Sequence, residues 1–393
     1  HALPTPHLAA LTGAQVAGLT THQAANLTTD HLVALTSYHI AALNSSQLSG
    51  MRSSHLAAIE TVDIKALTTG QIGSLTNNQI TQGLTTDQVI ALQTHQLVAL
   101  KTSQIANGLT TDQIVSLSAA QAASLLTAQV ASLSVANLQA LETGDLAALT
   151  VAQVASLTTH QAANLTTDQI VALTTAQTAG LKGTQIAALT ATQVGAIETL
   201  DIQALTTGQV ISLTTHQIAN GLTTDQVIAL GTQQVQALTT GQLVALTTGN
   251  IAAIEAGDLA SLKTHQIAAL TTSQVALGLT TDQIIALTTD QVRSLTTGQL
   301  TGLNSDQLAA IETKDIAALK TNQVEALTTA QQERKSNEEE KTEQNSGHRN
   351  SKKKGDGGGV RTGLRARLGT RSCLLPREQV PSSFHFIAVD MTP

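Results

Sequence analysis

Residues 205–212, LTTGQVIS, carry the pattern that decides the fold. The same unit returns as LTTHQIAN at 213–220, LTTDQVIA at 222–229 and LTTGQLVA at 238–245. Its consensus is Leu, Thr, Thr or Ser, a variable residue, Gln, an aliphatic residue, a variable residue and Ala or Ser, and then the next Leu. We number these octad positions one to eight. A tandem repeat of this regularity decides the architecture before any local feature does.

The octads follow one another from Leu3 to about residue 330, which makes about 41 units. Four single residues interrupt the period, each just before an LTTDQ unit: Gly83, Gly108, Gly221 and Gly278. A longer, seven-octad period of about 57 residues is marked by acidic octads headed by Leu141, Ile197, Ile254 and Ile311. We therefore predict one octad array over residues 1–330. Residues 331–393 break the pattern, and we expect a disordered or unrelated tail there.

Three backbone structures have to be compared for an eight-residue period. One continuous α-helix is excluded, because each Leu would turn about 80° from the last and no fixed apolar face would form. A β-solenoid stays open as the alternative, since Thr, Val and Ile favour strands. An all-α solenoid of short helices restarted every eight residues fits best, because Thr and Gln stand at capping-box spacing, as in Thr206 and Gln209.

The helical interpretation makes further local predictions. The pattern leaves open which Thr of each pair is the N-cap. Five acidic residues at position four are expected in the first helical turn, where the helix dipole favours an anion: Asp87, Asp112, Asp168, Asp225 and Asp282. The four inserted glycines are expected to form left-handed caps or slightly wider corners. A helix this short is unstable alone, so we expect only a stack of units to be stable.

Composition limits the classes of function. The chain has no Trp, one Tyr and two Phe, so the core must consist of Leu, Ile, Val and Ala. Residues 1–330 carry 8 Lys and Arg against 19 Asp and Glu, which argues against nucleic-acid binding. The one cysteine, Cys373, excludes a disulfide framework. No run of 18 apolar residues occurs, so we expect no membrane span.

Histidines and paired acids are the only candidates for a site in the repeats. One group of histidines occupies position four: His22, His95, His160, His216 and His265. Another replaces Gln at position five: His31, His39 and His55. The acid pairs are three residues apart: Glu60/Asp63, Glu142/Asp145, Glu198/Asp201, Glu255/Asp258 and Glu312/Asp315. Metal binding requires ligands that converge and catalysis requires a desolvated acid, so we interpret these residues as exposed helix starts and surface decoration.

No motif for nucleotide, metal or nucleophilic chemistry occurs in the repeats. The run GDGGG at 355–359 is a low-complexity segment, and the basic residues Lys352–Lys354 are typical of a solvated linker. We therefore predict no catalytic, cofactor-binding or metal-binding residues, no cofactor and no enzymatic activity. If one face does bind a partner, the features that recur with the seven-octad period are where we expect it.

The LTTDQ, LTTGQ and LTTAQ units over residues 3–330 resemble the tandem arrays of large bacterial secreted or surface exoproteins, often labelled as haem-utilisation or adhesion proteins. The resemblance implies export, a place outside the cell or at its surface, and partners among host or cell-surface macromolecules. We expect a non-enzymatic structural or adhesive region. The alternative is an intracellular solenoid scaffold that binds proteins or, less readily, nucleic acid.

Overall fold

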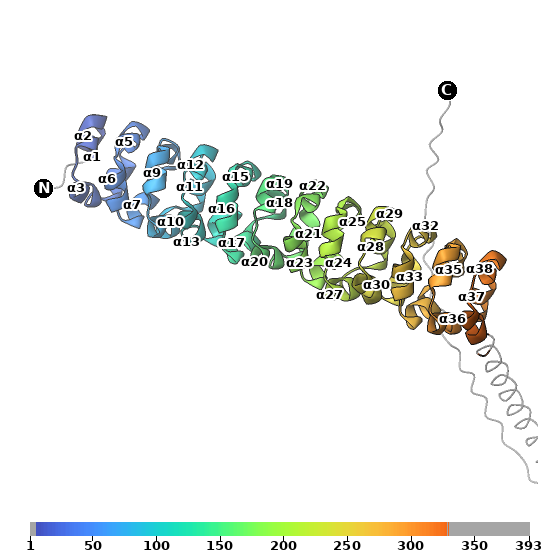
Figure 1. Cartoon of the computed structure of the whole chain (residues 1–393). Coiled ribbons are helices and arrows are strands. Elements are labelled where there is room, and N and C mark those ends of the chain that lie inside the picture. The colour runs from blue at the N-terminus through green and yellow to red at the C-terminus, as the bar shows by residue number, and fades with distance from the viewer. Residues whose placement is uncertain (1–4, 328, 330–393) are drawn as a thin grey trace, which may run out of the picture. The chain divides into compact units, whose positions relative to one another are not determined.

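The computed structural model describes residues 5–327 and 329, and within them the fold is all-α. Between Thr5 and Ala317 the chain forms 38 α-helices and one π-helical segment, η1, and the described residues contain no strand (Figure 1). The α-solenoid predicted from the octads is confirmed, and the β-solenoid alternative is wrong. The predicted tail at 331–393 lies outside the described residues.

Each helix packs against the helix three octads further along the chain, so three octads make one turn of the solenoid. The helices consequently form three stacks, which turn gradually about the rod of helices in Figure 1. We call them the first, second and third stacks. A feature that recurs at every third octad therefore stays within one stack.

The first stack holds α1 (Thr5–Ala9), α4 (Thr29–Val33), α7 (Ser53–Ala57), α10 (Asn77–Gly83), α13 (Thr102–Asn107), α16 (Thr127–Ser132), α19 (Val151–Ala155), α22 (Thr175–Gly180), α25 (Thr199–Ala204), α28 (Thr224–Ala229), α31 (Thr248–Ala253), η1 (Gln274–Gly278) and α36 (Thr297–Gly302). The second holds α2 (Gly13–Ala17), α5 (Ser37–Ala42), α8 (Thr61–Ile64), α11 (Thr86–Ala91), α14 (Thr111–Val115), α17 (Val135–Ala140), α20 (Thr159–Ala163), α23 (Gly183–Ala188), α26 (Thr207–Ser212), α29 (Thr232–Ala237), α32 (Ala256–Ala260), α34 (Thr281–Ala286) and α37 (Ser305–Ala309). The third holds α3 (Thr21–Ala25), α6 (Ser45–Gly50), α9 (Thr69–Ser74), α12 (Thr94–Val98), α15 (Ala119–Ser124), α18 (Thr143–Ala148), α21 (Thr167–Ala172), α24 (Ala191–Ala196), α27 (Thr215–Asn220), α30 (Thr240–Ala245), α33 (Thr264–Ala269), α35 (Thr289–Ser294) and α38 (Thr313–Ala317).

The first Thr of each pair starts the helix, which answers the question that the sequence left open. At α26, Thr206 is the N-cap with extended backbone, and its hydroxyl accepts the Gln209 N–H at 3.2 Å. The Gln209 side-chain oxygen in turn accepts the Thr206 N–H at 2.7 Å, which completes a capping box. The helix ends at Leu213, where ψ becomes 131°. The predicted acids at position four lie in the first turn, as Asp225 does in α28.

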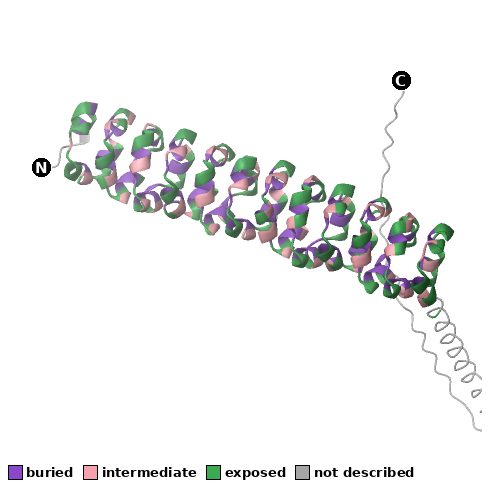
Figure 2. Ribbon diagram, viewed as in Figure 1, coloured by how far each residue is buried: buried purple, intermediate pink, exposed green. Residues whose placement is uncertain are grey.

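Positions one and six form the apolar core. Leu205 at position one is 4% exposed and Val210 at position six is 0% exposed, and their equivalents join in one buried cluster from Val16 to Ile311. Figure 2 shows the buried residues along the inside of the rod and the exposed residues on its outer surface. Because every turn covers the apolar residues of its neighbours, the stack supplies the burial that a single six-residue helix lacks.

The four inserted glycines do not form left-handed caps, so that part of the prediction was wrong. Gly108 and Gly221 have φ of −104° and −115°. The extra residue instead widens the helix end into a π-type turn, in which the next Leu N–H bonds the oxygen five residues earlier, as from Leu222 to Gln217 at 3.0 Å. Glycine is needed for space: a Cβ on Gly221 would lie 2.5 Å from the Ala191 oxygen in the neighbouring turn.

Replacing Gly221 by Ala tests this account of the wider corners. Gly221→Ala is expected to destabilise the array by about 1–3 kcal/mol, because backbone atoms must move to admit the methyl group. Gly208→Ala is the matched control, since its Cβ would meet nothing closer than 3.9 Å, and a gain of up to about 1 kcal/mol is expected from helix propensity. Urea denaturation followed by circular dichroism measures both. Equal effects of the two substitutions would contradict the proposed steric cause.

Candidate functional site

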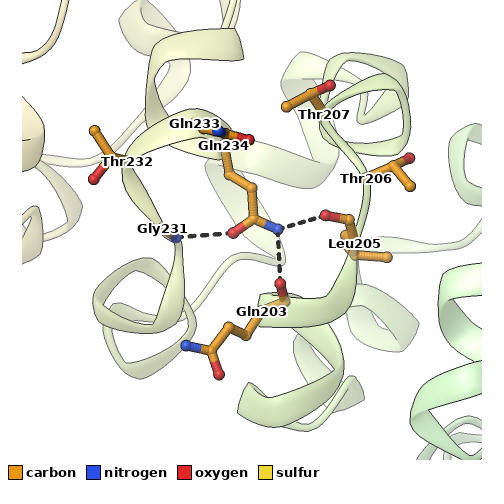
Figure 3. A pocket seen from close by; sticks show the side chains of 8 residues that line it. All are labelled: Gln203, Leu205, Thr206, Thr207, Gly231, Thr232, Gln233 and Gln234. Atoms are coloured by element: carbon orange, nitrogen blue, oxygen red, sulfur yellow. Dashed lines mark hydrogen bonds between the residues drawn. The ribbon is translucent and has the colours of Figure 1, made fainter.

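The position-five glutamines are buried and join one turn of the solenoid to the next. Gln234, at the start of α29, is 6% exposed. Its side-chain oxygen accepts the Gly231 N–H at 2.8 Å, while its Nε2 donates to the carbonyl oxygens of Leu205 at 2.7 Å and Gln203 at 3.3 Å (Figure 3). Gln203 lies in the last turn of α25, and Leu205 lies at the corner between α25 and α26, in the preceding turn of the solenoid. We call this two-sided interaction the corner bridge.

The corner bridge repeats along the array, and the position-one acceptor lies 28 or 29 residues before the glutamine. At Gln242 the side-chain oxygen accepts the Thr239 N–H at 2.8 Å, and Nε2 donates to the oxygens of Val210 at 2.8 Å and Leu213 at 2.7 Å. These two acceptors precede the glutamine by 32 and 29 residues. The Leu213 oxygen has no other hydrogen-bond donor among the described residues. The glutamine therefore satisfies a buried carbonyl that the helices leave without a partner.

Lys101 and Gly231 show which half of the interaction the corner bridge requires. Neither residue has a side-chain acceptor for the helix N-terminus, yet each donates its backbone N–H to the glutamine three residues on, at 2.6 Å and 2.8 Å. The threonine hydroxyl is therefore dispensable at the N-cap, whereas the glutamine amide is retained. This explains why position two tolerates Lys and Gly.

Histidine replaces glutamine near the start of the array, and His31, His39 and His55 are buried there, so their interpretation as exposed helix starts was wrong. His39 Nδ1 accepts the Thr36 N–H at 3.2 Å, and its Nε2 lies 2.7 Å from the Leu11 oxygen. These two contacts require a neutral ring with the proton on Nε2, because Nδ1 must accept. His31 Nδ1 accepts the Thr28 N–H in the same way. A neutral histidine thus reproduces both halves of the glutamine interaction.

His55 lacks part of this arrangement, since its buried Nδ1 has no hydrogen-bond partner. Burial first, and the nearby Arg52 charge second, lower the pKa of His55 below its usual 6.5. Protonation therefore costs more in the folded array than in the unfolded chain. The stability of this part of the array is full above about pH 6.5 and declines as the pH falls below it.

The remaining histidines lie where the sequence suggested, on the exposed starts of helices. All five position-four residues are exposed: His22, His95, His160, His216 and His265. His31 and His55 belong to consecutive turns of the first stack, but His39 belongs to the second. The described residues contain no group of three or more His, Cys, Asp or Glu side chains arranged to hold a metal ion.

The acid pairs differ from the surface decoration expected of them. In each pair the Glu is exposed at the N-cap, but the Asp at position five is buried, with exposures of 1–9%. The five aspartates occupy the place that glutamine has elsewhere: Asp63, Asp145, Asp201, Asp258 and Asp315. The expectation was wrong because an Asp side chain at position five points inward, as the glutamine side chain does in the other octads.

An aspartate accepts hydrogen bonds but, when ionised, donates none. Asp63, Asp258 and Asp315 accept from a hydroxyl 26 residues earlier, that of Ser37, Thr232 and Thr289 respectively. Asp145 and Asp201 each keep a buried Oδ2 with no partner. Burial first, and the Glu142 charge second, raise the pKa of Asp145 above its usual value.

The features that recur with the seven-octad period do not stay in one stack. Seven octads are two turns and one further octad, so successive acidic octads move from stack to stack. They lie at α8 in the second stack, α18 in the third, α25 in the first, α32 in the second and α38 in the third. The stacks themselves turn about the rod, so α18, α25, α32 and α38 nevertheless lie along the same side of it, the upper side in Figure 1. Binding at this period stays a prediction.

One surface hollow of about 640 Å³ lies where Gly231 leaves the N-cap position without a side chain (Figure 3). It is lined by Gln203, Leu205, Thr206, Thr207, Gly231, Thr232, Gln233 and Gln234. The lining offers amides, hydroxyls and aliphatic surface, and no titratable group.

No helix within the described residues is both long enough and apolar enough to cross a bilayer.

These observations define a class of protein, the α-solenoids built from tandem short repeats. More narrowly, residues 56–94, 138–175, 194–232, 251–289 and 308–332 match the family model described as the ALTTAQ repeat, and these parts of the array are similar to that family. The last four matches each begin three positions before the head of an acidic octad, at Leu141, Ile197, Ile254 and Ile311. The matches of the family model therefore start at the same place in successive seven-octad blocks. Neither the curated proteins nor the solved structures contain a match.

The sequence predicted that the glutamine caps its own helix. It did not predict that the same side chain donates to a carbonyl oxygen in the preceding turn. One signal was available: Gln is kept at position five even where the N-cap is Lys101, Lys182 or Gly231. A residue kept when its capping partner is lost must have another partner. Its identity depends on the number of octads per turn, which the local sequence does not state.

Replacing Gln242 tests the corner bridge. Gln242→Glu keeps the shape but removes the donor to Val210 and Leu213 and buries a charge, so a loss of about 2–4 kcal/mol is expected. Gln242→His is expected to cost less than half as much, because His39 already forms both contacts in this chain. The measurement is urea denaturation. Gln233→Glu, at an exposed position, is the control and should be nearly neutral; a similar loss there would contradict the account.

Proposed function

We propose that the described array is a non-enzymatic, stiff spacer within a bacterial secreted or cell-surface protein. The observation that carries this proposal is the continuity of the contacts along the rod. A single buried core extends from Val16 to Ile311, and each turn bonds to the turn before it through the position-five side chains. Such an array resists bending at every turn, and its length depends only on the number of units.

The dimensions and surface suit a spacer. Helices pack at interaxial distances of roughly 8–10 Å, so thirteen turns extend roughly 110 Å. The outer surface consists largely of Thr, Gln and small residues with scattered acids. A surface with few charges and a net negative charge keeps a long rod soluble and repels nucleic acid.

Placement outside the cell rests on the resemblance of the LTTxQ units to exoprotein arrays. An adhesive role for the same region follows if the rod presents binding groups, and the acidic octads present theirs on all three stacks. Those of α18, α25, α32 and α38 lie along one side of the rod in Figure 1. A flat partner surface therefore meets the same feature in successive blocks.

Duplicating residues 197–253 tests the spacer. This block holds seven octads and Gly221, so a second copy inserted after Ala253 keeps the octad period. The added two and one-third turns are expected to lengthen the rod by roughly 20 Å. Small-angle X-ray scattering measures the maximum dimension and the cross-section. A larger cross-section, or an unchanged maximum dimension, would contradict the proposal.

Location in the native cell tests the second part of the proposal. Antibodies raised against the folded array are expected to bind intact cells or to detect the protein in the medium. Lysed cells serve as the control for total protein. Detection in the cytosol alone would refute the surface placement and favour the intracellular scaffold, while leaving the spacer role to the length measurement.

A further inference from the structure

Every corner of the solenoid needs a donor from the following turn. Glutamine supplies it from Nε2, and asparagine does so with a shorter side chain. Asn137 Nδ2 donates to the Leu109 oxygen at 2.9 Å, and Asn250 Nδ2 donates to the Leu222 oxygen at 3.0 Å. Both acceptors are 28 residues earlier, at position one. A side chain of this length at position five therefore reaches the position-one carbonyl.

Asp145 has the length of asparagine and occupies position five of α18. The register of 28 residues seen at Asn137 and Asn250 assigns it the carbonyl of Leu117, at the corner between α14 and α15. Asp145 is 6% exposed, and its Oδ2 has no hydrogen-bond partner. The Leu117 oxygen likewise has no donor among the described residues. Two buried acceptors thus share one corner.

The hydroxyl donor that bonds the aspartate in other acidic octads is absent at Asp145. Asp258 accepts the Thr232 hydroxyl at 2.6 Å, and Asp315 accepts the Thr289 hydroxyl at 2.6 Å. At the equivalent place before Asp145 the chain has Ala119, which has no hydroxyl. The preceding turn therefore offers Asp145 no hydroxyl donor at this place.

No positive charge compensates the Asp145 carboxylate. Helices α15, α17 and α19 carry no titratable side chain, while α21 carries Asp168 and α14 carries Asp112. Glu142, at the N-cap of α18, adds a third negative charge. Burial and a wholly acidic surrounding both favour the neutral form of a carboxyl group, and the raised pKa of Asp145 agrees with this direction.

We propose that Asp145 is a proton-binding site that closes the corner between α14 and α15. When the pH falls, Oδ2 takes a proton from solvent, and the new O–H donates to the Leu117 oxygen as Asn137 Nδ2 does to Leu109. The folded array binds this proton more tightly than the unfolded chain. The added stability is thus present at acidic pH and is lost as the pH rises through the folded pKa.

Hydrogen exchange of the full chain, at mildly acidic and at neutral pH, tests the proposal. Protection factors for α14, α15 and α18, normalised for intrinsic exchange, are expected to fall at neutral pH by about tenfold for each unit by which the pKa is raised. Asp145→Asn supplies the donor permanently. Ala119→Thr supplies the hydroxyl found at Thr232 and Thr289. Both variants are expected to hold these helices at high protection at either pH.

Three outcomes would overturn the proposal. The first is a wild-type array whose protection in these helices is the same at both pH values, which would indicate that a bridging water already fills the corner. The second is a pH effect of equal size in both variants, which would place the titrating group elsewhere. The third is protection restored at neutral pH by millimolar Ca²⁺ in the wild type but not in Asp145→Asn, which would make the corner a cation site.

Discussion

The fold depends on one two-sided hydrogen-bonding requirement at octad position five. The side chain there must accept the N–H that starts its own helix and donate to a carbonyl that ends a helix one turn earlier, as Gln234 does. Glutamine meets both demands, and so does neutral histidine, as at His39. Asparagine donates to the carbonyl, and ionised aspartate can only accept. Because the position is buried, each substitution changes how well one corner is satisfied, and the corners need not be equally stable.

The two periods of the sequence have different structural meanings. The octad sets the helix, and three octads set the turn, so contacts link each octad to its third neighbour. The seven-octad period is not a whole number of turns and therefore moves its acidic octads from stack to stack. A chain extended by whole blocks of this kind keeps its packing, because equivalent positions still meet in the core. It also returns a block-specific feature to the same side of the rod, as Figure 1 shows for α25, α32 and α38.

Much of the helix, and little of the packing between turns, could be predicted from the sequence. Thr206 and Gln209 showed the N-terminus of α26, and Leu213 with Val210 showed the core, because these relations are local. The partner of Gln209 in the preceding turn could not be predicted, since it depends on three octads per turn. For the same reason Asp145 was taken for a surface acid, and the choice between a left-handed cap and a wider corner at Gly221 stayed open. Their burial and close contacts arise from residues of other turns.

The most direct test of the corner bridge is hydrogen exchange of the glutamine side-chain amides, observed by NMR on protein labelled with ¹⁵N at glutamine. If the Nε2 protons bond buried carbonyls, those of Gln209, Gln234 and Gln242 should exchange as slowly as backbone amides of the surrounding helices. The exposed Gln233 provides the reference for free exchange within the same molecule. Exchange of the buried amides at the rate of Gln233, in an array whose backbone amides stay protected, would contradict the account.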